Sequence, residues 1–444
     1  MKLGTFKGGI HPYEGKELSK DREIAELEVG GEFVFPVSQH IGAPATINVK
    51  VKDRVLVGQI IADATGFVSA NVVSSVSGTV KKIEPRLMAN GSYVNSIIVE
   101  NDGLYETVEG YGALRDPSTM SREEIRAAIR AAGIVGMGGA GFPTDVKLTP
   151  KNPDQIDYII VNGAECEPYL TSDYREMTEN PEKVIEGLKI ELSLFDHAQG
   201  VIGIENNKPD AIKRFTELVK DEPNIRVQAL KTKYPQGGER TLIKACTGRE
   251  INSKMLPADA GCIVNNIDTV IAIGKAVAHN IPLIVRTITV TGDCIKTPQN
   301  FHVRCGANYN ALIEAAGGIV GEPEKIISGG PMMGQALFST DIPVTKNSSA
   351  LTLLSEDAVA KEAQTACIRC GKCADVCPGH IIPQVLMSYA SVGDFEGFEK
   401  ANGMECCECG CCTFVCPARR NLTQTFKLAR KTVMANRRKE AAKK

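Results

Sequence analysis

The spacing of apolar residues changes several times along the chain. Residues 44–84 alternate Val and Ile with polar residues and break at Gly-Gln and Ser-Gly pairs, which predicts short strands joined by turns. Residues 121–148 begin with Ser121 and Glu124 in a capping-box arrangement, and apolar residues at helical spacing follow. Residues 284–335 read as strand, turn, strand and helix before a Gly-Gly pair. The sequence therefore predicts a multidomain α/β fold.

Glycines crowd the segment after the predicted helix. Without Cβ atoms, backbone N–H groups can approach a ligand closely, so such a loop can cradle a phosphate or lie against a flat ring. The Rossmann fingerprint does not fit, because a helix precedes the loop, and the P-loop does not fit because Gly-Lys-Ser/Thr is missing. A flexible turn without a ligand is the alternative. The candidate residues are Gly136, Gly138, Gly139, Gly141, Phe142 and Lys147.

Three further loops place polar side chains directly after apolar runs. The first ends a strand-like run, the second is a Gly-Gly turn before a helix, and the third is an Asn pair between a short apolar run and a helix. Together with the glycine loop, they favour a binding site over a plain turn. Their candidate residues are Asn162, Glu165 and Glu167; Gly238 and Glu239; and Asn265, Asn266 and Thr269.

Two cysteine runs near the C-terminal end carry the strongest chemical signal. Both read Cys-x2-Cys-x2-Cys-x3-Cys-Pro, the spacing of two-cluster ferredoxins, in which the fourth cysteine of each run binds the cluster of the other run. The glycines Gly371 and Gly410 allow each loop to wrap a cluster. We therefore predict two [4Fe–4S] clusters. One is held by Cys367, Cys370, Cys373 and Cys416, and the other by Cys406, Cys409, Cys412 and Cys377.

The composition indicates which kind of chemistry the cysteine thiols carry out. The chain has fifteen cysteines and its N-terminus has no apolar signal core, so we expect reduced thiols and no export. Zinc prefers two separated Cys-x2-Cys pairs and fits the two runs badly. Cys407 and Cys411 fall outside the pattern and are expected not to be ligands. Cys294 and Cys305 have no clear partners and are expected to be buried structural thiols.

Charge is balanced overall but unevenly placed. A net charge of -2 gives no field that would draw the chain to nucleic acid. No apolar run reaches about 18 residues, so no transmembrane helix is expected. Residues 431–444 form a basic tail. We expect a solvated helix there, and a dock for an acidic partner or the anionic membrane face is the alternative.

The glycine loop and the three polar loops occur in an order and at a spacing similar to those of the flavin- and NADH-binding subunit of respiratory complex I. The resemblance covers residues 120–280 and implies that FMN and NAD(H) bind there, with the glycine loop and Lys147 holding flavin and nucleotide. It implies flavin contacts from Asn162, Asn265, Asn266 and Thr269, nucleotide hydroxyl contacts from Glu167 and Glu239, and stacking of Phe142 on nicotinamide or adenine. Met137, Ala164 and Arg240 depart from that family's pattern.

The flanking segments extend the resemblance. Residues 44–84 resemble a biotinyl/lipoyl-type barrel sandwich, but no lysine lies between Lys52 and Lys81, so a structural or docking role is expected in place of a swinging arm. Residues 284–335 resemble the β-grasp domain that follows the flavin domain in complex I. Along essentially the whole chain, this domain order resembles the family of the C subunit of the Rnf electron transport complexes, which exchange electrons between ferredoxin and NAD at a membrane.

The predicted organisation has five parts. They are an N-terminal barrel-sandwich hybrid (1–110), a Rossmann-like FMN/NAD(H) domain of complex I type (118–280), a β-grasp domain (284–340), a ferredoxin-like helical module for two [4Fe–4S] clusters (355–430) and the basic tail (431–444).

The predicted function is that of a peripheral oxidoreductase subunit on the cytoplasmic side of the cell membrane. It would pass electrons between NAD(H), FMN and the two clusters, with a path to ferredoxin through other subunits of an ion-translocating complex. The flavin would carry the hydride chemistry, so no catalytic side chain is expected, and His302 and His380 are interpreted as structural or surface residues. A microcompartment-type cobalamin reductase and a non-catalytic electron-relay scaffold are the alternatives.

Overall fold

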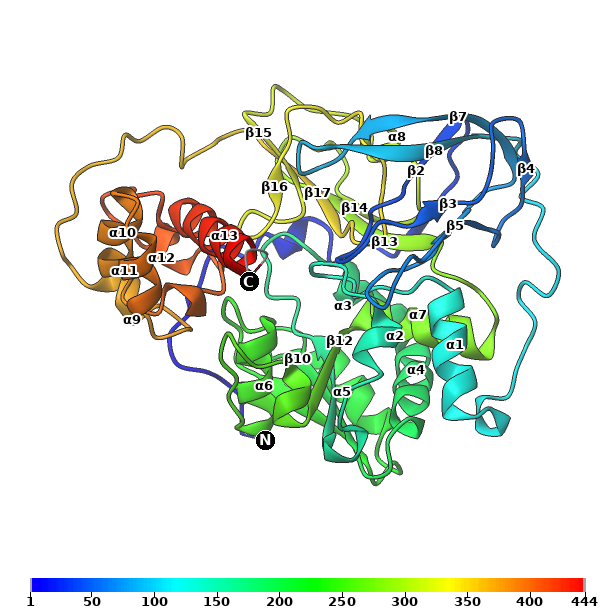
Figure 1. The fold of residues 1–444 in the computed structure, drawn as a ribbon, viewed down its shortest axis with the longest axis horizontal. Coiled ribbons are helices and arrows are strands. Elements are labelled where there is room, and N and C mark those ends of the chain that lie inside the picture. The colour runs from blue at the N-terminus through cyan, green and yellow to red at the C-terminus, as the bar shows by residue number, and fades with distance from the viewer. Residues whose placement is uncertain (1, 442–444) are drawn as a thin grey trace.

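A computed structural model describes residues 2–441 of the chain (Figure 1). A parallel sheet with helices on its faces lies at the bottom of the view, in green and cyan, and two further β-rich units lie above it, in blue and yellow. A compact helical module, in orange and red, stands to the side and is connected by a long loop. The predicted multidomain α/β fold is confirmed.

The N-terminal unit consists of two antiparallel sheets that share one apolar core. Phe33 and Phe35 on β2 are buried and share one apolar core with Ile97 on the neighbouring strand and with Ile288 of the yellow unit. The two β-rich units are therefore packed as one body. The strands are β2 (Glu32–Pro36), β8 (Tyr93–Asn101), β7 (Gly78–Leu87) and β4 (Arg54–Val55) in one sheet, and β3 (Thr46–Ile47), β5 (Ile60–Asp63) and β6 (Val72–Val73) in the other.

The second unit is built on a four-stranded parallel sheet in the order β11-β10-β9-β12. Strand β9, one of the two inner strands, contains Ile159, Ile160 and Val161. All three residues are fully buried, because helices cover both faces of such a sheet. The predicted capping box of Ser121 and Glu124 opens helix α1. The strands are β9 (Tyr158–Gly163), β10 (Gln199–Glu205), β11 (Ile225–Leu230) and β12 (Cys262–Asn266), and the helices are α1 (Arg122–Ala131), α2 (Thr144–Lys147), α3 (Ser172–Glu179), α4 (Pro181–Ser193), α5 (Pro209–Leu218), α6 (Glu239–Thr247) and α7 (Ile267–Ala278).

The third unit is a six-stranded mixed sheet with one helix, in the order β1-β14-β13-β17-β15-β16. Two of its strands come from outside residues 284–340, because β1 joins from the N-terminal segment and β17 follows the long turn after β16. Its elements are β1 (Ala25–Leu27), β13 (Val285–Thr291), β14 (Gln299–Arg304), α8 (Tyr309–Ala315), β15 (Lys325–Ser328), β16 (Gln335–Ala336) and β17 (Ala350–Leu354).

The helical module has its own small core, in which Phe398, Phe426 and Val433 are buried. Val433 belongs to the last helix, so part of the basic tail is packed against the module and is not simply solvated, while residues 442–444 of that tail lie outside the described residues. Within residues 2–441, every helix falls short of the length and apolarity needed to span a bilayer. The helices are α9 (Lys372–Asp375), α10 (Pro383–Ser391), α11 (Phe395–Lys400), α12 (Cys411–Phe414) and α13 (Leu422–Ala441).

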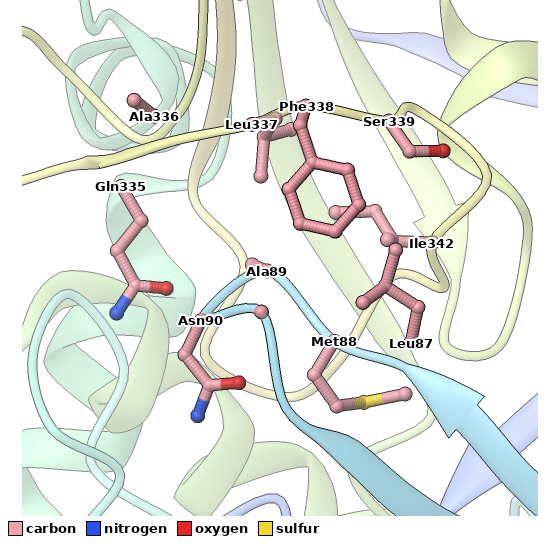
Figure 2. Close-up of a pocket in the computed structure, with 11 residues that line it drawn as sticks. Leu87, Met88, Ala89, Asn90, Gln335, Ala336, Leu337, Phe338, Ser339 and Ile342 are labelled. Atoms are coloured by element: carbon pink, nitrogen blue, oxygen red, sulfur yellow. The ribbon is translucent and has the colours of Figure 1, made fainter.

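A surface hollow of about 390 Å³ lies between the β7–β8 turn and residues 335–342 (Figure 2). Phe338 and Leu337 face Met88 and Leu87 across it, and Asn90 and Gln335 line its polar end. The hollow shares no residue with the glycine loop or the cysteine runs. The hollow therefore lies at the interface between the N-terminal unit and the mixed-sheet unit.

Candidate functional site

The carboxyl ends of β9 and β12 bring two asparagines side by side. Asn162 pairs in register with Asn266 on the neighbouring parallel strand, and α/β sheets bind ligands at this edge. Asn162 donates to the Gly237 carbonyl at 2.9 Å, and Asn266 donates to the Asp173 carboxylate at 2.7 Å. The side chain of Asn266 also caps helix α7 by accepting from Asp268 N–H. The sheet edge thereby connects the loops that the sequence singled out.

The glycine loop is fixed at both of its ends. Met137 N–H donates to the Thr269 hydroxyl on α7 at 3.0 Å, and Gly136 N–H donates to the Phe142 carbonyl at 2.8 Å. The loop is therefore held against the N-terminus of α7, which begins directly after Asn266.

The backbone of the glycine loop is exposed at Gly138 and Gly139. Gly138 has a φ of +75°, and a Cβ there would lie 3.1 Å from the Asn266 amide, so this position requires glycine. A Cβ at Gly139 would meet no atom within 4 Å, and Gly138 and Gly139 are both exposed. The loop thus offers an uncovered stretch of backbone beside Asn266.

Two ionisable side chains lie beneath this surface. Lys147 donates to the Val264 carbonyl at 2.8 Å, and the fully buried Glu191 on α4 accepts from the Asn265 amide at 2.9 Å. Burial lowers the pKa of Lys147, opposed by the charges of Glu239 and Glu191. Burial raises the pKa of Glu191 to about 7, opposed by its hydrogen bond from Asn265 and by the charge of Lys147. Two buried groups that can gain or lose a proton, Lys147 and Glu191, therefore lie below the glycine loop.

The structure directs two of the predicted carboxylates elsewhere. Glu165 accepts from the Asp173 N–H at 2.7 Å at the start of α3. Glu167 accepts from the N–H groups of Met332 and Met333, at 2.6 and 3.1 Å, in the loop after β15. Burial raises the pKa of Glu167 to about 7, opposed by these two hydrogen bonds. Glu167 therefore ties the parallel-sheet unit to the mixed sheet.

The Gly-Gly turn completes the sheet edge. Gly238 is the residue before helix α6, and Glu239 is its first residue. The carbonyl of Gly237 binds Asn162, so this turn adjoins the asparagine pair. Gln236, next in sequence, is fully buried. Of the predicted site residues, the structure gathers the glycine loop, Lys147, Gly238, Glu239 and the three asparagines with Thr269.

The three departures from the complex I pattern lie away from the open top of the loop. Met137 is 4% exposed and contacts the buried Arg286 guanidinium beneath the loop. Ala164 is fully buried. Arg240 forms an ion pair with Glu405 of the helical module at 3.0 Å. None of these substitutions therefore fills the space above Gly139.

Several buried polar atoms around this edge are unpaired, and this supplies a test of whether a flavin would fit. Within residues 2–441, Asn265 Oδ1, Glu191 Oε1 and both amide atoms of Gln236 lie buried without a hydrogen-bond partner. Such groups are costly unless a ligand or water satisfies them. With the open glycine backbone beside them, the residues present fit a polar, flat cofactor.

The two cysteine runs adopt the same backbone conformation, 39 residues apart. Arg369 N–H lies 3.4 Å from Cys367 Sγ, and Glu408 N–H lies 3.4 Å from Cys406 Sγ. The runs are thus a structural repeat in the register Cys-x2-Cys-x2-Cys-x3-Cys. The equivalent residues with positive φ are Arg369 and Glu408 (56° and 60°), Gly371 and Gly410 (81° and 84°), and His380 and Arg419 (52° and 51°).

The repeat brings the fourth cysteine of each run to the other run. One hollow is lined by Cys377 of the first run together with five cysteines of the second run, which are the predicted ligands Cys406, Cys409 and Cys412 and the two expected non-ligands Cys407 and Cys411. The N–H of Thr365, two residues before Cys367, donates to the carbonyl of Ala418, two residues after Cys416, at 3.0 Å, which places Cys416 beside the first run. In each run the fourth cysteine thus lies beside the other run, which is the arrangement of two-cluster ferredoxins.

Other cysteines and histidines have structural surroundings. Among residues 2–441, no three His, Cys, Asp or Glu side chains gather as they would around a single metal ion. Cys294 and Cys305 are buried, as expected. The Cys411 thiol lies 3.9 Å from the Tyr234 carbonyl oxygen. His302 is held between two carboxylates, which raise its pKa against the effect of burial.

Sequence reasoning missed Glu191, Asp173 and Gln236. Burial, with the charges of Glu165 and Asp268, raises the pKa of Asp173 well above its usual range. The signal for Glu191 was its helical spacing from Val184 and Leu188, which puts it on the buried face of α4, where a charged residue is rare without a partner. Asp173 and Gln236 carried no such signal, because their neighbours come from distant segments.

Comparison with known families supports this arrangement. Residues 129–275 match the family model described as the Nuo51 FMN-binding domain. Residues 4–104 match the RnfC barrel sandwich hybrid domain, and residues 287–336 match the SLBB domain. An NAD+-reducing [NiFe]-hydrogenase in the H2-reduced state shares the fold, with a TM-score of 0.50, 17% identity, and coverage of 72% of this chain and 62% of the hydrogenase chain. The molecule is thus a multidomain protein with an FMN-binding domain of the Nuo51 type.

Related proteins define the family more narrowly. The C subunit of the Na(+)-translocating ferredoxin:NAD(+) oxidoreductase complex of Acetobacterium woodii is 43% identical over 442 residues, with 99% of both chains covered. The C subunit of the proton-translocating complex of Clostridium ljungdahlii is 44% identical over 384 residues, covering 86% of this chain and 84% of that protein. The C subunit of the ion-translocating oxidoreductase complex of Rhodobacter capsulatus is 39% identical, with 96% and 82% covered. The chain belongs to the RnfC family, the C subunits of the ion-translocating ferredoxin:NAD(+) oxidoreductase complexes, which confirms the resemblance read from its motifs.

Proposed function

We propose that this chain is the NAD(H)-reacting subunit of an ion-translocating ferredoxin:NAD oxidoreductase and that it carries FMN and two [4Fe–4S] clusters. The observation that carries the proposal is the open glycine backbone at Gly138 and Gly139, beside buried polar atoms without partners, in a chain that also holds the repeated cysteine runs. Hydride chemistry and single-electron chemistry would then meet in one molecule.

FMN, when bound, would supply the conversion between hydride transfer and single-electron transfer. The backbone N–H groups of the glycine loop would approach the flavin, and Asn265 and Asn266 would hydrogen-bond to it at the carboxyl ends of the strands. Lys147 would provide positive charge beneath the flavin or its phosphate. No side chain needs to donate or remove a proton for hydride transfer, and the chain's contribution is orientation and exclusion of water.

The nucleotide would lie on the exposed side of the glycine loop. Phe142 is half-buried at the end of this loop and would stack on nicotinamide or adenine. Glu239 at the start of α6 would accept from nucleotide hydroxyls. For Glu167 the contacts with Met332 and Met333 favour a structural role over the nucleotide contact implied by the complex I resemblance.

The clusters would connect the flavin to the other components of the complex. One set is Cys367, Cys370, Cys373 and Cys416, and the other is Cys406, Cys409, Cys412 and Cys377. We propose that other subunits of the complex hold the chain peripherally on the cytoplasmic side of the membrane, and that the path to ferredoxin runs through them.

Cofactor analysis of the chain purified without oxygen tests this proposal. We expect about one FMN and about eight irons with eight acid-labile sulfides per chain, as two [4Fe–4S] clusters require. A chain with both clusters but no flavin would replace the proposal with a non-catalytic electron relay. A preparation with zinc and without sulfide would overturn the cluster assignment.

A further inference from the structure

Asp173, in the first turn of helix α3, is hydrogen-bonded to one asparagine of the proposed flavin site. Its Oδ2 accepts from the Asn266 amide at 2.7 Å, and the same amide nitrogen would lie 3.1 Å from a Cβ at Gly138 on the glycine loop. The amide oxygen of Asn266 accepts from Asp268 N–H at 3.0 Å. Because this helix cap fixes the amide, Oδ2 of Asp173 remains an acceptor, and a proton bound by Asp173 is carried by Oδ1.

Two nearly buried ion pairs lie beside Asp173. Glu165 accepts from the Asp173 N–H at 2.7 Å, and its carboxylate lies 3.6 Å from the Lys16 ammonium. Asp268 is paired with Arg286 at 2.6 Å. Each of these two carboxylates has a cation, whereas Asp173 forms no ion pair among residues 2–441. Asp173 is therefore the acid of this cluster whose charge is left without a counterion.

The surroundings of Asp173 favour its protonated form. Burial raises the pKa of Asp173 well above its usual range, and the charges of Glu165 and Asp268 raise it further. The hydrogen bond from Asn266 and the charge of Arg286 oppose this rise. Other acids on α3 and α4 that are not exposed have partners of their own, which are Glu176 with His302, Glu186 with His279, and Glu191 with Asn265. An additional negative charge beside Asn266 would raise the pKa of Asp173 again, because a like charge disfavours the ionised form.

We propose that Asp173 takes up a proton from solvent when the flavin is reduced and releases it when the flavin is reoxidised, and that it acts on the flavin as a positioning residue through Asn266. This inference rests on the proposed function. Hydride transfer from NADH yields NAD+ and leaves one additional negative charge in the site. An O–H bond then forms at Oδ1 of Asp173, which is half-buried and can receive the proton from solvent, and this bond breaks when the two electrons leave. The charge is thus balanced without a proton in the hydride step.

The pH dependence of the flavin midpoint potential tests this proposal without NADH and without turnover. A potential falls more steeply with pH when reduction takes up an additional proton, because the two events stabilise each other reciprocally. One pH unit is a tenfold change in proton concentration, which corresponds to about 30 mV for one proton in a two-electron couple. We expect this additional slope in the wild type within the range of about pH 5 to 9 that buried acids reach. Asp173→Asn should lose it.

This substitution separates the proton from the hydrogen bond. An amide oxygen at position 173 still accepts from Asn266, so a purely structural role would survive in Asp173→Asn and the slope would stay as in the wild type. Asp357→Asn is the matched control, since Asp357 is also half-buried but pairs with Lys325 of the mixed sheet at 2.8 Å. The control should keep the wild-type slope.

Glu165→Gln supplies a second test that leaves Asp173 in place. Its amide oxygen can still accept from the Asp173 N–H, while the loss of one negative charge should move the additional slope to lower pH by about one unit. Equal slopes in the wild type and Asp173→Asn would overturn the proposal, and so would an unchanged pH range in Glu165→Gln. A chain that binds no FMN would overturn the proposed function and this inference together, whereas bound FMN with equal slopes would overturn the inference alone.

Discussion

Gly139→Val is the sharpest perturbation of the proposed flavin site, because the protein itself has room for the new side chain. A Cβ at Gly139 meets no atom within 4 Å, the residue is exposed, and its φ lies outside the left-handed region. At Gly138, in contrast, φ is +75° and a Cβ would press on Asn266. Only the Gly139 substitution therefore separates loss of the ligand from damage to the fold.

The expected magnitude follows from what the valine would displace. If flavin lies against the glycine backbone, the added methyl groups overpack the contact, which typically costs about 1–3 kcal/mol. The dissociation constant of FMN should rise roughly five- to 150-fold, while the thermal midpoint of the flavin-free protein stays within about 2 °C of wild type.

The assay is a titration of the flavin-free protein with FMN, followed by quenching of flavin fluorescence, beside a thermal scan. Gly30→Val is the matched control, since Gly30 is also exposed, meets nothing within 4 Å and has no left-handed φ. A folded Gly139→Val protein that binds FMN within twofold of wild type would refute the placement of the flavin on this loop.

Three further outcomes are expected. Cys377→Ser should damage the cluster of the second run and Cys416→Ser that of the first, and iron analysis with electron paramagnetic resonance would show the assignment wrong if each variant lost the cluster of its own run. The pKa of Glu191 is raised to about 7 from the ordinary 4.5, so the folded state binds this proton more tightly and wild-type stability should fall as pH rises from about 4.5 to 7, by roughly 3 kcal/mol. Glu191→Gln should flatten that part of the pH profile in urea unfolding of the flavin-free protein, and an unchanged profile would contradict the buried acid. Lys431→Glu with Arg438→Glu, both exposed on α13, should weaken attachment to partner proteins or membrane at low salt, with the difference from wild type shrinking at about 0.5 M salt, and equal attachment at every salt concentration would leave this helix face without a docking role.

Local chemistry made part of this molecule predictable. Three of the four proposed ligands of each cluster lie within a few residues of each other, so the spacing of these cysteines and the turns at Gly371 and Gly410 can be recognised in short stretches of sequence. The capping box of Ser121 and Glu124 is equally local. The order of the domains could be predicted from the sequence because each domain family has its own short motifs.

Long-range contacts account for what was not predicted. Strand β1 joins a sheet whose other strands begin about 260 residues later, and no local pattern indicates that pairing. Glu167 looked like a ligand-binding acid beside Asn162, yet a backbone turn sends it to Met332 on another unit. The contact of Tyr234 with Cys409 is of the same kind, because it depends on how the parallel-sheet unit and the helical module pack together.

Rapid mixing of NADH with the oxygen-free protein tests the central claim most directly. We expect loss of the flavin absorbance band first, followed by bleaching of the cluster absorbance, with about two NADH consumed per chain, one for the two electrons of FMN and one for the two electrons that the clusters accept. Protein that contains FMN and both clusters, is reduced by dithionite, and shows no flavin bleaching with NADH would contradict the account.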